Sequence, residues 1–280
     1  MVNSKTNSER PIFNLFLGQD MMKHIDEYSG SACPIELFFD DTFLGVGTSF
    51  IWKQGDNHYL ITNWHNVSGR DPFTGKHISK TAAEPNRIKV WFNAHQSVGA
   101  RYREFIDLYD KDGHPIWYIH PKYGTGCDVV AIPLIDVNAQ IKFYPINSLS
   151  QANLDISVGH DLFVLGYPFG ISRMALPVWK RASLATEPEL TSDEEPYVLL
   201  DTASRPGMSG SPIIRRGWGS VAMDDGSTAT FSGGSATRVF GIYSGRLTTS
   251  DPLDAELGIA WPIELVPTII ESATQDTSNH

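Results

Sequence analysis

The sequence predicts an all-β protein whose antiparallel strands fold into barrels or sandwiches. Short apolar or alternating stretches recur along the 280 residues and are separated by Gly, Asp, Asn or Pro, as in HYLITNW, RIKVWFNA, DVVAIPLI and RVFGIYS. Helical periodicity is scarce, and strands do not alternate with helical segments as they do in βαβ units. Many short strands with turn signals at this chain length favour the barrel or sandwich classes.

The expected elements follow in chain order. The strands GVGTSFIW and HYLITNW are joined by KQGDN, which is typical of a hairpin turn, and a second turn is expected over Asp110 to Gly113. An N-terminal arm over residues 1–30 contains a candidate helix, and PIELVPTIIESA predicts a short C-terminal helix. Residues 224–237 are expected to be mobile, and residues 271–280 to form a disordered tail.

Composition excludes several classes of function. The chain is 41% hydrophobic and 19% charged, which is typical of a soluble globular protein of one two-lobed unit or two domains. A net charge of −10 argues against a nucleic-acid partner. We find no apolar run long enough to span a membrane or to form a signal-peptide core. With the two cysteines Cys33 and Cys127, these features predict a cytoplasmic protein, and we expect no metal ion and no cofactor.

His65 is the first candidate catalytic residue. The chain contains nine histidines, so that a single one carries little information. His65, however, follows the apolar strand in HYLITNWHNV at the point where that strand ends in a bend. A histidine at such a bend presents its ring at a barrel edge, where it can act as a general base.

Asp128 is the candidate partner of that base. It lies in HPKYGTGCDVVAIPL, at the point where a loop ends and an apolar strand begins. A carboxylate in that position is costly to bury unless it is hydrogen-bonded or paired, and a histidine N–H is a suitable partner. The competing acids Asp107, Asp136 and Asp201 lack this combination of loop and apolar strand, although a turn-capping role for Asp128 stays open at this point.

Ser209 is the candidate nucleophile. It lies in ASRPGMSGSPII between Gly207 and Gly210, in a turn that is either an ordinary surface loop or a device for presenting a hydroxyl group. Glycine supplies the backbone angles of a tight turn, and the N–H groups of Gly207 and Ser209 are candidates for an oxyanion hole. Ser209 is favoured over Ser211 because it is central between the glycines.

The order His, Asp, Ser is one of the chain orders in which serine triads occur. Around these residues, TNWHNV, HPKYGTGCDVVAIPL and GMSGSP resemble the motifs of trypsin-like, chymotrypsin-fold serine proteases. DTASRPGMSGSP, GYPFG and GIAWPIELV resemble the HtrA-like bacterial branch of that family. The resemblance covers roughly residues 34–270. Six ordered motifs at sensible spacing make it a strong signal.

The resemblance implies two antiparallel six-stranded β-barrels with the active site in the cleft between them. The first barrel, over residues 31–150, would carry His65 and Asp128, and the second, over residues 151–270, would carry Ser209. The implied activity is hydrolysis of peptide bonds through an acyl-enzyme, with a protein or peptide as substrate. No PDZ domain is expected after the second barrel.

The resemblance also implies residues that bind the substrate. An extended peptide would pair with the strand that begins at Ser244. The candidate substrate-binding residues are Ala203, Ser204, Tyr243, Ser244, Gly245, Arg246 and Gly258. Without an aspartate at position 203 a buried substrate Lys or Arg would lack a counter-ion, so we expect an uncharged, small or medium-sized residue before the scissile bond. Arg246 leaves an acidic preference open.

Met208 departs from the digestive proteases, which carry at this position an aspartate that pairs with a newly cut N-terminus. Activation by such a cut is therefore not expected. Three alternatives stay open: a pseudoprotease whose cleft mainly binds an extended peptide, a protease that an activating protein partner switches on, and an esterase that uses the same acyl chemistry on a small ester.

Overall fold

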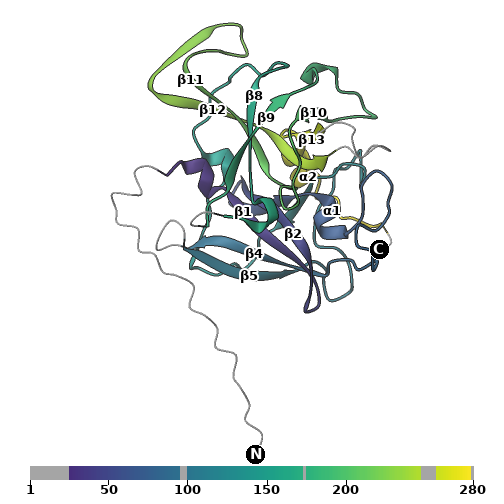
Figure 1. Ribbon diagram of the computed structural model, residues 1–280. Helices are drawn as coiled ribbons and strands as arrows, with labels where there is room; N and C mark the ends of the chain where they lie inside the picture. The colour runs from purple at the N-terminus through teal and green to yellow at the C-terminus, as the bar shows by residue number, and fades with distance from the viewer. Residues whose placement is uncertain (1–24, 95–99, 173–174, 247–256, 279–280) are drawn as a thin grey trace, which may run out of the picture.

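The computed structural model describes residues 25–94, 100–172, 175–246 and 257–278, and these form mainly antiparallel strands in two sheets (Figure 1). Neighbouring strands of the first sheet follow the order β5-β4-β1-β2-β3-β6, with β7 paired to β4. These strands are β1 (Ala32–Phe39), β2 (Thr42–Gln54), β3 (Asn57–Thr62), β4 (Arg87–Ala94), β5 (Arg101–Asp107), β6 (Val130–Pro133) and β7 (Ile141–Lys142).

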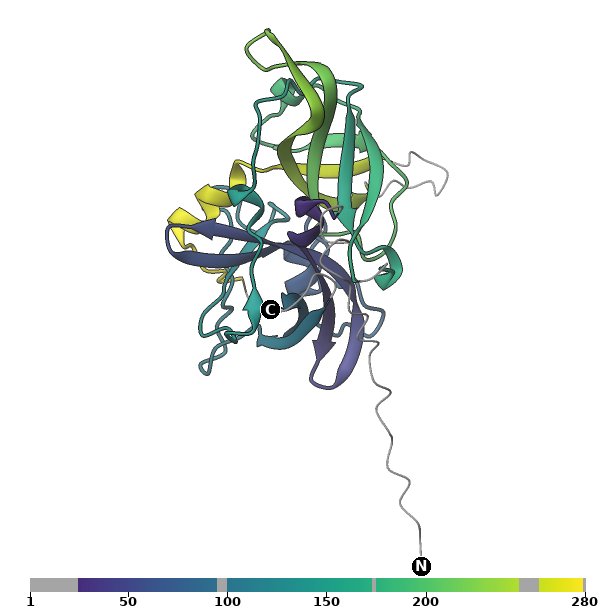
Figure 2. The ribbon, with the colours of Figure 1, turned by 90° about the vertical axis from the view of Figure 1, so that its left-hand side faces the viewer.

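The second sheet closes into a ring in the order β10-β13-β12-β11-β8-β9, which leaves it without a free edge. Its strands are β8 (Asp161–Gly166), β9 (Val178–Leu184), β10 (Val198–Asp201), β11 (Pro212–Ala222), β12 (Thr228–Arg246) and β13 (Leu257–Pro262). Figure 2 shows the first sheet below and the ring above it. The predicted chymotrypsin-like, all-β class is thus confirmed.

The first sheet differs in detail from the expected six-stranded barrel. In the described residues it has seven strands, and β5 and β6, at the two ends of its order, form no ladder with each other. Strand β1 pairs only with the first half of β4, up to Val90. The short strand β7 pairs with the second half of β4, where Asn93 lies opposite Lys142. A single bridge, between Tyr118 and Ala131, borders β6.

The helices are short. Helix α1 (Trp64–Ser68) follows β3, and α2 (Leu265–Ser272) follows β13, as the sequence predicts for the C-terminal end. The 3-10 turns are η2 (Glu27–Gly30), η3 (Ile146–Ser148), η4 (Pro168–Gly170) and η5 (Pro188–Leu190). The helix expected within residues 1–30 falls mostly outside the described residues. None of the described helices is long and apolar enough to cross a membrane.

Three clusters of buried apolar side chains hold the chain together. One lies in the first sheet around Trp117 and one inside the ring around Leu200. The third joins Phe50 of the first sheet, Trp261 of the ring and Ile269 of α2. Since each large apolar side chain contributes roughly 1.5–3 kcal/mol on burial, this shared cluster makes the two sheets one packed unit.

The C-terminal segment is ordered up to residue 278, where the sequence predicted disorder from 271 onward. Thr274 accepts a hydrogen bond from the N–H of Ile119 at 2.9 Å. The buried carboxylate of Asp276 accepts the indole N–H groups of Trp64 and Trp117 at 2.8 and 3.2 Å. These polar contacts, which lie far apart in the sequence, fix a segment whose composition alone is typical of a frayed end.

Residues 224–237, expected to be mobile, instead belong to a long β11–β12 hairpin that projects from the ring (Figure 2). Ser220 pairs with Thr230, and their hydroxyl groups lie 2.8 Å apart. Cross-strand Ser/Thr pairs of this kind stabilise a hairpin without an apolar core. Hydrophobic patterning does not reveal such a strand.

Candidate active site

His65 and Asp128 are positioned by the ends of neighbouring strands. Strands β3 and β6 pair in antiparallel register, with Thr62 opposite Val130. Helix α1 begins immediately after β3, behind the extended Asn63, and places His65 in its first turn. Asp128 lies two residues before β6 on the adjacent strand. The paired strand ends therefore bring the two side chains together, as the sequence predicts.

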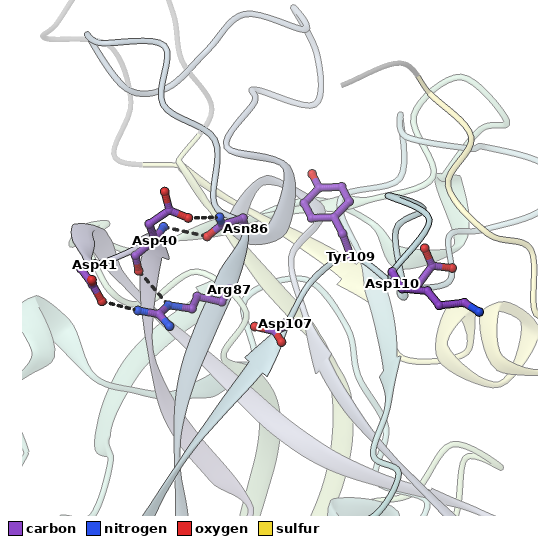
Figure 3. Close-up of a pocket in the computed structure, with 8 residues that line it drawn as sticks. Asp40, Asp41, Asn86, Arg87, Asp107, Tyr109 and Asp110 are labelled. Carbon is purple, nitrogen blue, oxygen red and sulfur yellow. Dashed lines mark hydrogen bonds and ion pairs between the residues drawn. The ribbon is translucent and has the colours of Figure 1, made fainter.

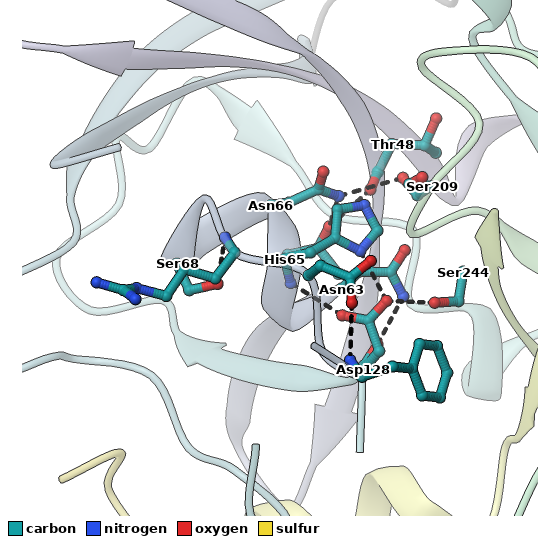
Figure 4. Close-up of polar contacts among 12 residues, drawn as sticks. Thr48, Asn63, His65, Asn66, Ser68, Asp128, Ser209 and Ser244 are labelled. Atoms are coloured by element: carbon teal, nitrogen blue, oxygen red, sulfur yellow. Dashed lines mark hydrogen bonds and ion pairs between the residues drawn. The ribbon is translucent and has the colours of Figure 1, made fainter. Parts of the chain in front are cut away.

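The two side chains are in direct contact (Figure 4). His65 Nδ1 lies 2.7 Å from Asp128 Oδ2, and the backbone N–H of His65 donates to Oδ1 at 2.9 Å. The Asp128 side chain is fully buried, and Ser244 Oγ also donates to Oδ2. Asn63 Nδ2 donates to the backbone carbonyl of Asp128 at 2.7 Å. The buried carboxylate is thus satisfied from three directions.

This environment changes the basicity of the imidazole. Burial lowers the pKa of His65. The charge of Asp128, its hydrogen bond and a contribution from Asp71 raise this pKa, and together they outweigh the effect of burial. The net pKa lies above the usual value for histidine. One side of the ring remains open to solvent, because 15% of the His65 side chain is exposed.

Ser209 lies in the turn between β10 and β11, which requires its glycines. Gly207 and Gly210 have φ values of 91° and 85°, a region that side-chain-bearing residues rarely adopt. A Cβ on Gly207 would lie 2.4 Å from the Tyr167 carbonyl oxygen, and one on Gly210 would lie 2.0 Å from that of Thr48. The turn therefore tolerates no side chain at either position.

Backbone contacts place Ser209 beside His65. The Ser209 carbonyl accepts the N–H of Thr48 at 2.8 Å and the side-chain amide of Asn66, the residue after His65, at 3.3 Å. In Figure 4 the imidazole lies between Asp128 and Ser209. Among the described residues the Ser209 hydroxyl forms no hydrogen bond with His65, and the contacts that place the two residues side by side are those of the backbone and of Asn66.

The backbone N–H groups of Gly207 and Ser209 have no hydrogen-bond partner within the described part of the chain. The neighbouring N–H groups of Met208, Gly210 and Ser211 all donate to backbone carbonyl groups, at distances of 2.8–3.2 Å. The turn thus leaves free the two donors that the sequence proposed for an oxyanion hole. Ser211 is fully buried, whereas Ser209 is partly exposed.

Several of the predicted substrate-binding residues surround Tyr243. This tyrosine is 1% exposed, and a Cβ on Gly258 would lie 2.5 Å from its ring, so the ring fills the space beside that glycine. Burial raises the pKa of Tyr243, against a lowering effect of the adjacent Ser204. Ala203 and Ser204 are half-buried.

A β-bulge sets the direction of Ser244. Tyr243 pairs with Ala260 and Gly245 with Ile259, so Ser244 is an extra residue on β12. Bulges of this kind re-aim side chains, and here the Ser244 hydroxyl contacts the carboxylate of Asp128 in the first sheet. The backbone of Arg246 pairs with Gly258, but its side chain lies outside the described residues.

The sequence predicts neither Thr48 nor Asn66 as a site residue. Both are buried and both contact the turn that carries Ser209: Thr48 through its N–H and hydroxyl, and Asn66 through its amide. In the sequence, only the immediate neighbours of these two residues hint at a role in the site. Thr48 is a polar residue in the middle of the GVGTSFIW strand, and Asn66 directly follows His65.

Within the described ranges, the other reactive groups do not form a second centre. Both cysteines are buried, and burial raises the pKa of Cys33 to about 11 and that of Cys127 further. The thiols are therefore not activated as nucleophiles. Among the described residues, no group of three or more His, Cys, Asp or Glu side chains is placed to hold a metal ion.

A separate hollow of about 600 Å³ lies where the β1–β2 turn meets β4 and β5 (Figure 3). Two of its carboxylates are engaged: Asp41 pairs with Arg87 at 2.7 Å, and Asp40 accepts from Asn86 at 2.7 Å. None of the predicted site residues lines it. The lining residues are Asp40, Asp41, Asn86, Arg87, Asp107, Tyr109, Asp110 and Lys111.

Comparison with known proteins gives one family and several similar structures. The Rv3671c protease from M. tuberculosis, in its active form, is 17% identical, with a TM-score of 0.45, and the match covers 100% of this chain and 96% of that chain. The MamO protease domain from Magnetospirillum magneticum is 14% identical, with a TM-score of 0.45 and coverage of 86% and 96%. The serine endoprotease from Yersinia pestis is 13% identical, with a TM-score of 0.45 and coverage of 87% and 62%.

No curated protein gives a significant match. The sequence profile described as "Trypsin-like peptidase domain", however, matches residues 47–223, which is more than half of the chain and includes His65, Asp128 and Ser209. The chain therefore belongs to the family of proteins with a trypsin-like peptidase domain.

Proposed function

We propose that the protein is a serine endopeptidase in which Ser209 is the nucleophile, His65 the general base and Asp128 the residue that orients it. The observation that carries the proposal is the 2.7 Å contact between His65 Nδ1 and the buried Asp128 carboxylate, next to a partly exposed serine. A histidine held in this way has its second nitrogen available to accept a proton.

Acylation then follows from the roles of these residues. Nε2 of His65 takes the proton from Ser209 Oγ as the oxygen forms a bond to the carbonyl carbon of the peptide. The electron pair of the carbonyl moves to its oxygen, which the N–H groups of Gly207 and Ser209 bind. When this intermediate collapses, the C–N bond breaks and His65 returns the proton to the leaving amine.

Deacylation repeats the sequence with water. His65 takes a proton from a water molecule, whose oxygen attacks the acyl carbon, and the same two N–H groups bind the new oxyanion. The ester bond then breaks, Ser209 regains its proton from His65, and the carboxylic acid product leaves. Asp128 stays ionised throughout, because its buried charge stabilises the imidazolium formed in each half of the reaction.

The same proposal includes a preference before the scissile bond for an uncharged residue of small or medium size. Ala203 offers no counter-ion to a buried Lys or Arg, and an unpaired buried charge is strongly disfavoured. The ring of Tyr243, packed against Gly258, supports a limited depth for the pocket. The substrate backbone would pair with the strand from Ser244 onward.

A fluorophosphonate probe and a denatured protein substrate test the proposal together. We expect the parent protein to be labelled and to cleave the substrate, and Ser209→Ala to lose both properties. Ser211→Ala is the matched control, since this serine lies in the same turn but is buried, and it should remain labelled. Labelling that survives in Ser209→Ala would refute the nucleophile assignment.

The alternatives give distinct results in the same experiment. A protein that binds peptides without cleaving them would not be labelled, and labelling only in the presence of a second protein would indicate partner activation. Labelling with ester hydrolysis but no cleavage of denatured protein would indicate an esterase.

A further inference from the structure

Thr48, in the middle of β2, uses all of its polar groups at the boundary between the two sheets. Its hydroxyl donates to the Gly207 carbonyl at 2.7 Å and accepts the N–H of Tyr167 at 3.2 Å. Its backbone N–H donates to the Ser209 carbonyl at 2.8 Å, and its carbonyl accepts the Thr62 hydroxyl at 2.8 Å. The residue is fully buried, so these bonds form away from water.

The peptide bonds on both sides of Gly207 are fixed by these contacts. In a trans peptide the C=O and N–H groups point in opposite directions. The Pro206 carbonyl accepts the N–H of Phe169 at 2.7 Å, so the N–H of Gly207 must point to the other side. The Gly207 carbonyl is held by Thr48. The free N–H of Gly207 therefore owes its direction to two hydrogen bonds made by other segments.

The contact with Phe169 also depends on Thr48. Phe169 adopts a left-handed conformation, with φ 54°, within the turn that begins at Tyr167. Such a conformation is unfavourable for phenylalanine and persists only where surrounding contacts hold it. The N–H of Tyr167, at the start of this turn, is bonded to the Thr48 hydroxyl. One hydroxyl group thus joins the two turns that set the position of Gly207.

Without these bonds the backbone at Gly207 could change conformation and lose the direction of its N–H group. A glycine allows the adjacent peptide plane to rotate, and rotation would turn the Pro206 carbonyl toward the position of the oxyanion. Met208 is an apolar residue and offers no charge to anchor the turn through an ion pair. Met208 is buried in the apolar cluster of the ring, so the polar part of the anchoring falls to hydrogen bonds such as those of Thr48.

We propose that Thr48 is a positioning residue for the oxyanion hole: its hydroxyl fixes the Gly207 carbonyl and the 167–169 turn, and thereby aims the Gly207 N–H at the reacting carbonyl. This inference rests on the proposed serine peptidase function. A residue in strand β2 of the first sheet would thus orient an N–H donor, that of Gly207, which precedes β11 of the second sheet.

The test compares Thr48→Val, which keeps the shape but removes the hydroxyl, with Thr48→Ser, which keeps the hydroxyl. We expect Thr48→Val to lower kcat by about 10²-fold, as for a misaligned oxyanion donor, with KM little changed. Thr48→Ser should keep most of the activity. Ser49→Ala is the matched control: it removes the adjacent buried hydroxyl, which bonds Cys33 instead of the turn, and should leave kcat unchanged.

A second measurement does not depend on activity. Hydrogen exchange followed by NMR should show faster exchange of the Tyr167 and Phe169 amides in Thr48→Val, but not in Thr48→Ser or Ser49→Ala. If the parent protein proves inactive, the proposed function fails, and this exchange pattern still decides whether Thr48 holds the turn. Unchanged exchange in Thr48→Val, an unchanged kcat, or equal losses in Thr48→Val and Thr48→Ser would overturn the inference.

Discussion

The carboxylate of Asp128 holds His65 at two points: Oδ2 contacts the ring nitrogen Nδ1 at 2.7 Å, and Oδ1 accepts the backbone N–H of the same residue at 2.9 Å. The first contact selects the tautomer of the ring, and the second fixes the helix turn that carries it. Ser244 reaches the same carboxylate from the other sheet. The orientation of the imidazole therefore depends on how the two sheets are packed.

Replacement of Asp128 by asparagine should lower kcat by about 10⁴-fold, because an amide that donates to Nδ1 leaves the wrong tautomer at the base. The measurement is kcat with a peptide substrate. Asp136→Asn is the control, since this aspartate is exposed and asparagine tolerates its positive φ of 52°. A loss smaller than tenfold in Asp128→Asn would contradict the role given to this carboxylate.

The pH profile should reflect the raised pKa of His65. The base acts when it is neutral, so kcat/KM should rise with pH through a pKa above the usual value of 6.5. Asp71→Asn removes one of the charges that raise this pKa, and should move the acid limb to lower pH without changing the plateau. If the acid limb of Asp71→Asn stays in place or moves to higher pH, the charge of Asp71 does not raise the pKa of His65.

Gly210→Ala should destabilise the fold far more than another glycine with similar backbone angles. A methyl group on Gly210 would lie 2.0 Å from the Thr48 carbonyl oxygen. At Gly226, where φ is 80°, nothing lies within 4 Å, so Gly226→Ala should cost only about 1–2 kcal/mol for the left-handed backbone. Chemical denaturation of both variants gives the comparison, and equal losses would show that the turn can relax.

Asp276→Ala should lower the free energy of unfolding by about 3 kcal/mol, because it removes the charged acceptor of two buried indole N–H groups. Asp225→Ala, in the exposed tip of the β11–β12 hairpin, should change it little. Thermal unfolding followed by tryptophan fluorescence is a suitable measurement, as both affected indoles report on the site directly.

Peptides that differ only in the residue before the scissile bond should be cleaved fastest with Ala, Val, Thr or Leu at that position. Lys and Arg peptides should be slower by roughly tenfold or more, because the pocket offers no counter-ion. Arg246→Ala should leave this order unchanged. A tenfold preference of the parent for Glu or Asp, lost in Arg246→Ala, would assign the pocket to acidic residues.

The positions of His65 and Asp128 could be predicted because His65 follows the end of one apolar strand and Asp128 precedes the start of another, and such transitions are local features of a sequence. The same holds for Gly207 and Gly210, whose backbone angles only glycine adopts easily. Once β3 and β6 pair, the contact between histidine and aspartate follows.

Other features could not be predicted because they depend on contacts between segments far apart in the chain. The hydroxyl of Thr48 finds its partners in turns more than a hundred residues away. Ser244 reaches Asp128 through a bulge that only the register of β12 and β13 reveals. Asp276 is held by hydrogen bonds from two distant tryptophans. The strands of the projecting hairpin pair polar residues with each other, so they lack the alternation of apolar and polar residues by which a strand is recognised in a sequence.

The return of α2 and Asp276 to the first sheet has a consequence for biosynthesis. The strands that carry His65 and Asp128 leave the ribosome first, the ring that carries Ser209 follows, and the carboxylate that binds Trp64, next to His65, is made after both. A nascent chain contains His65 and Asp128 long before it contains Ser209 or the segment that completes their support. The contacts that support the segment around His65 are therefore complete only after residues 265–276 have been translated, so that a chain still on the ribosome lacks them.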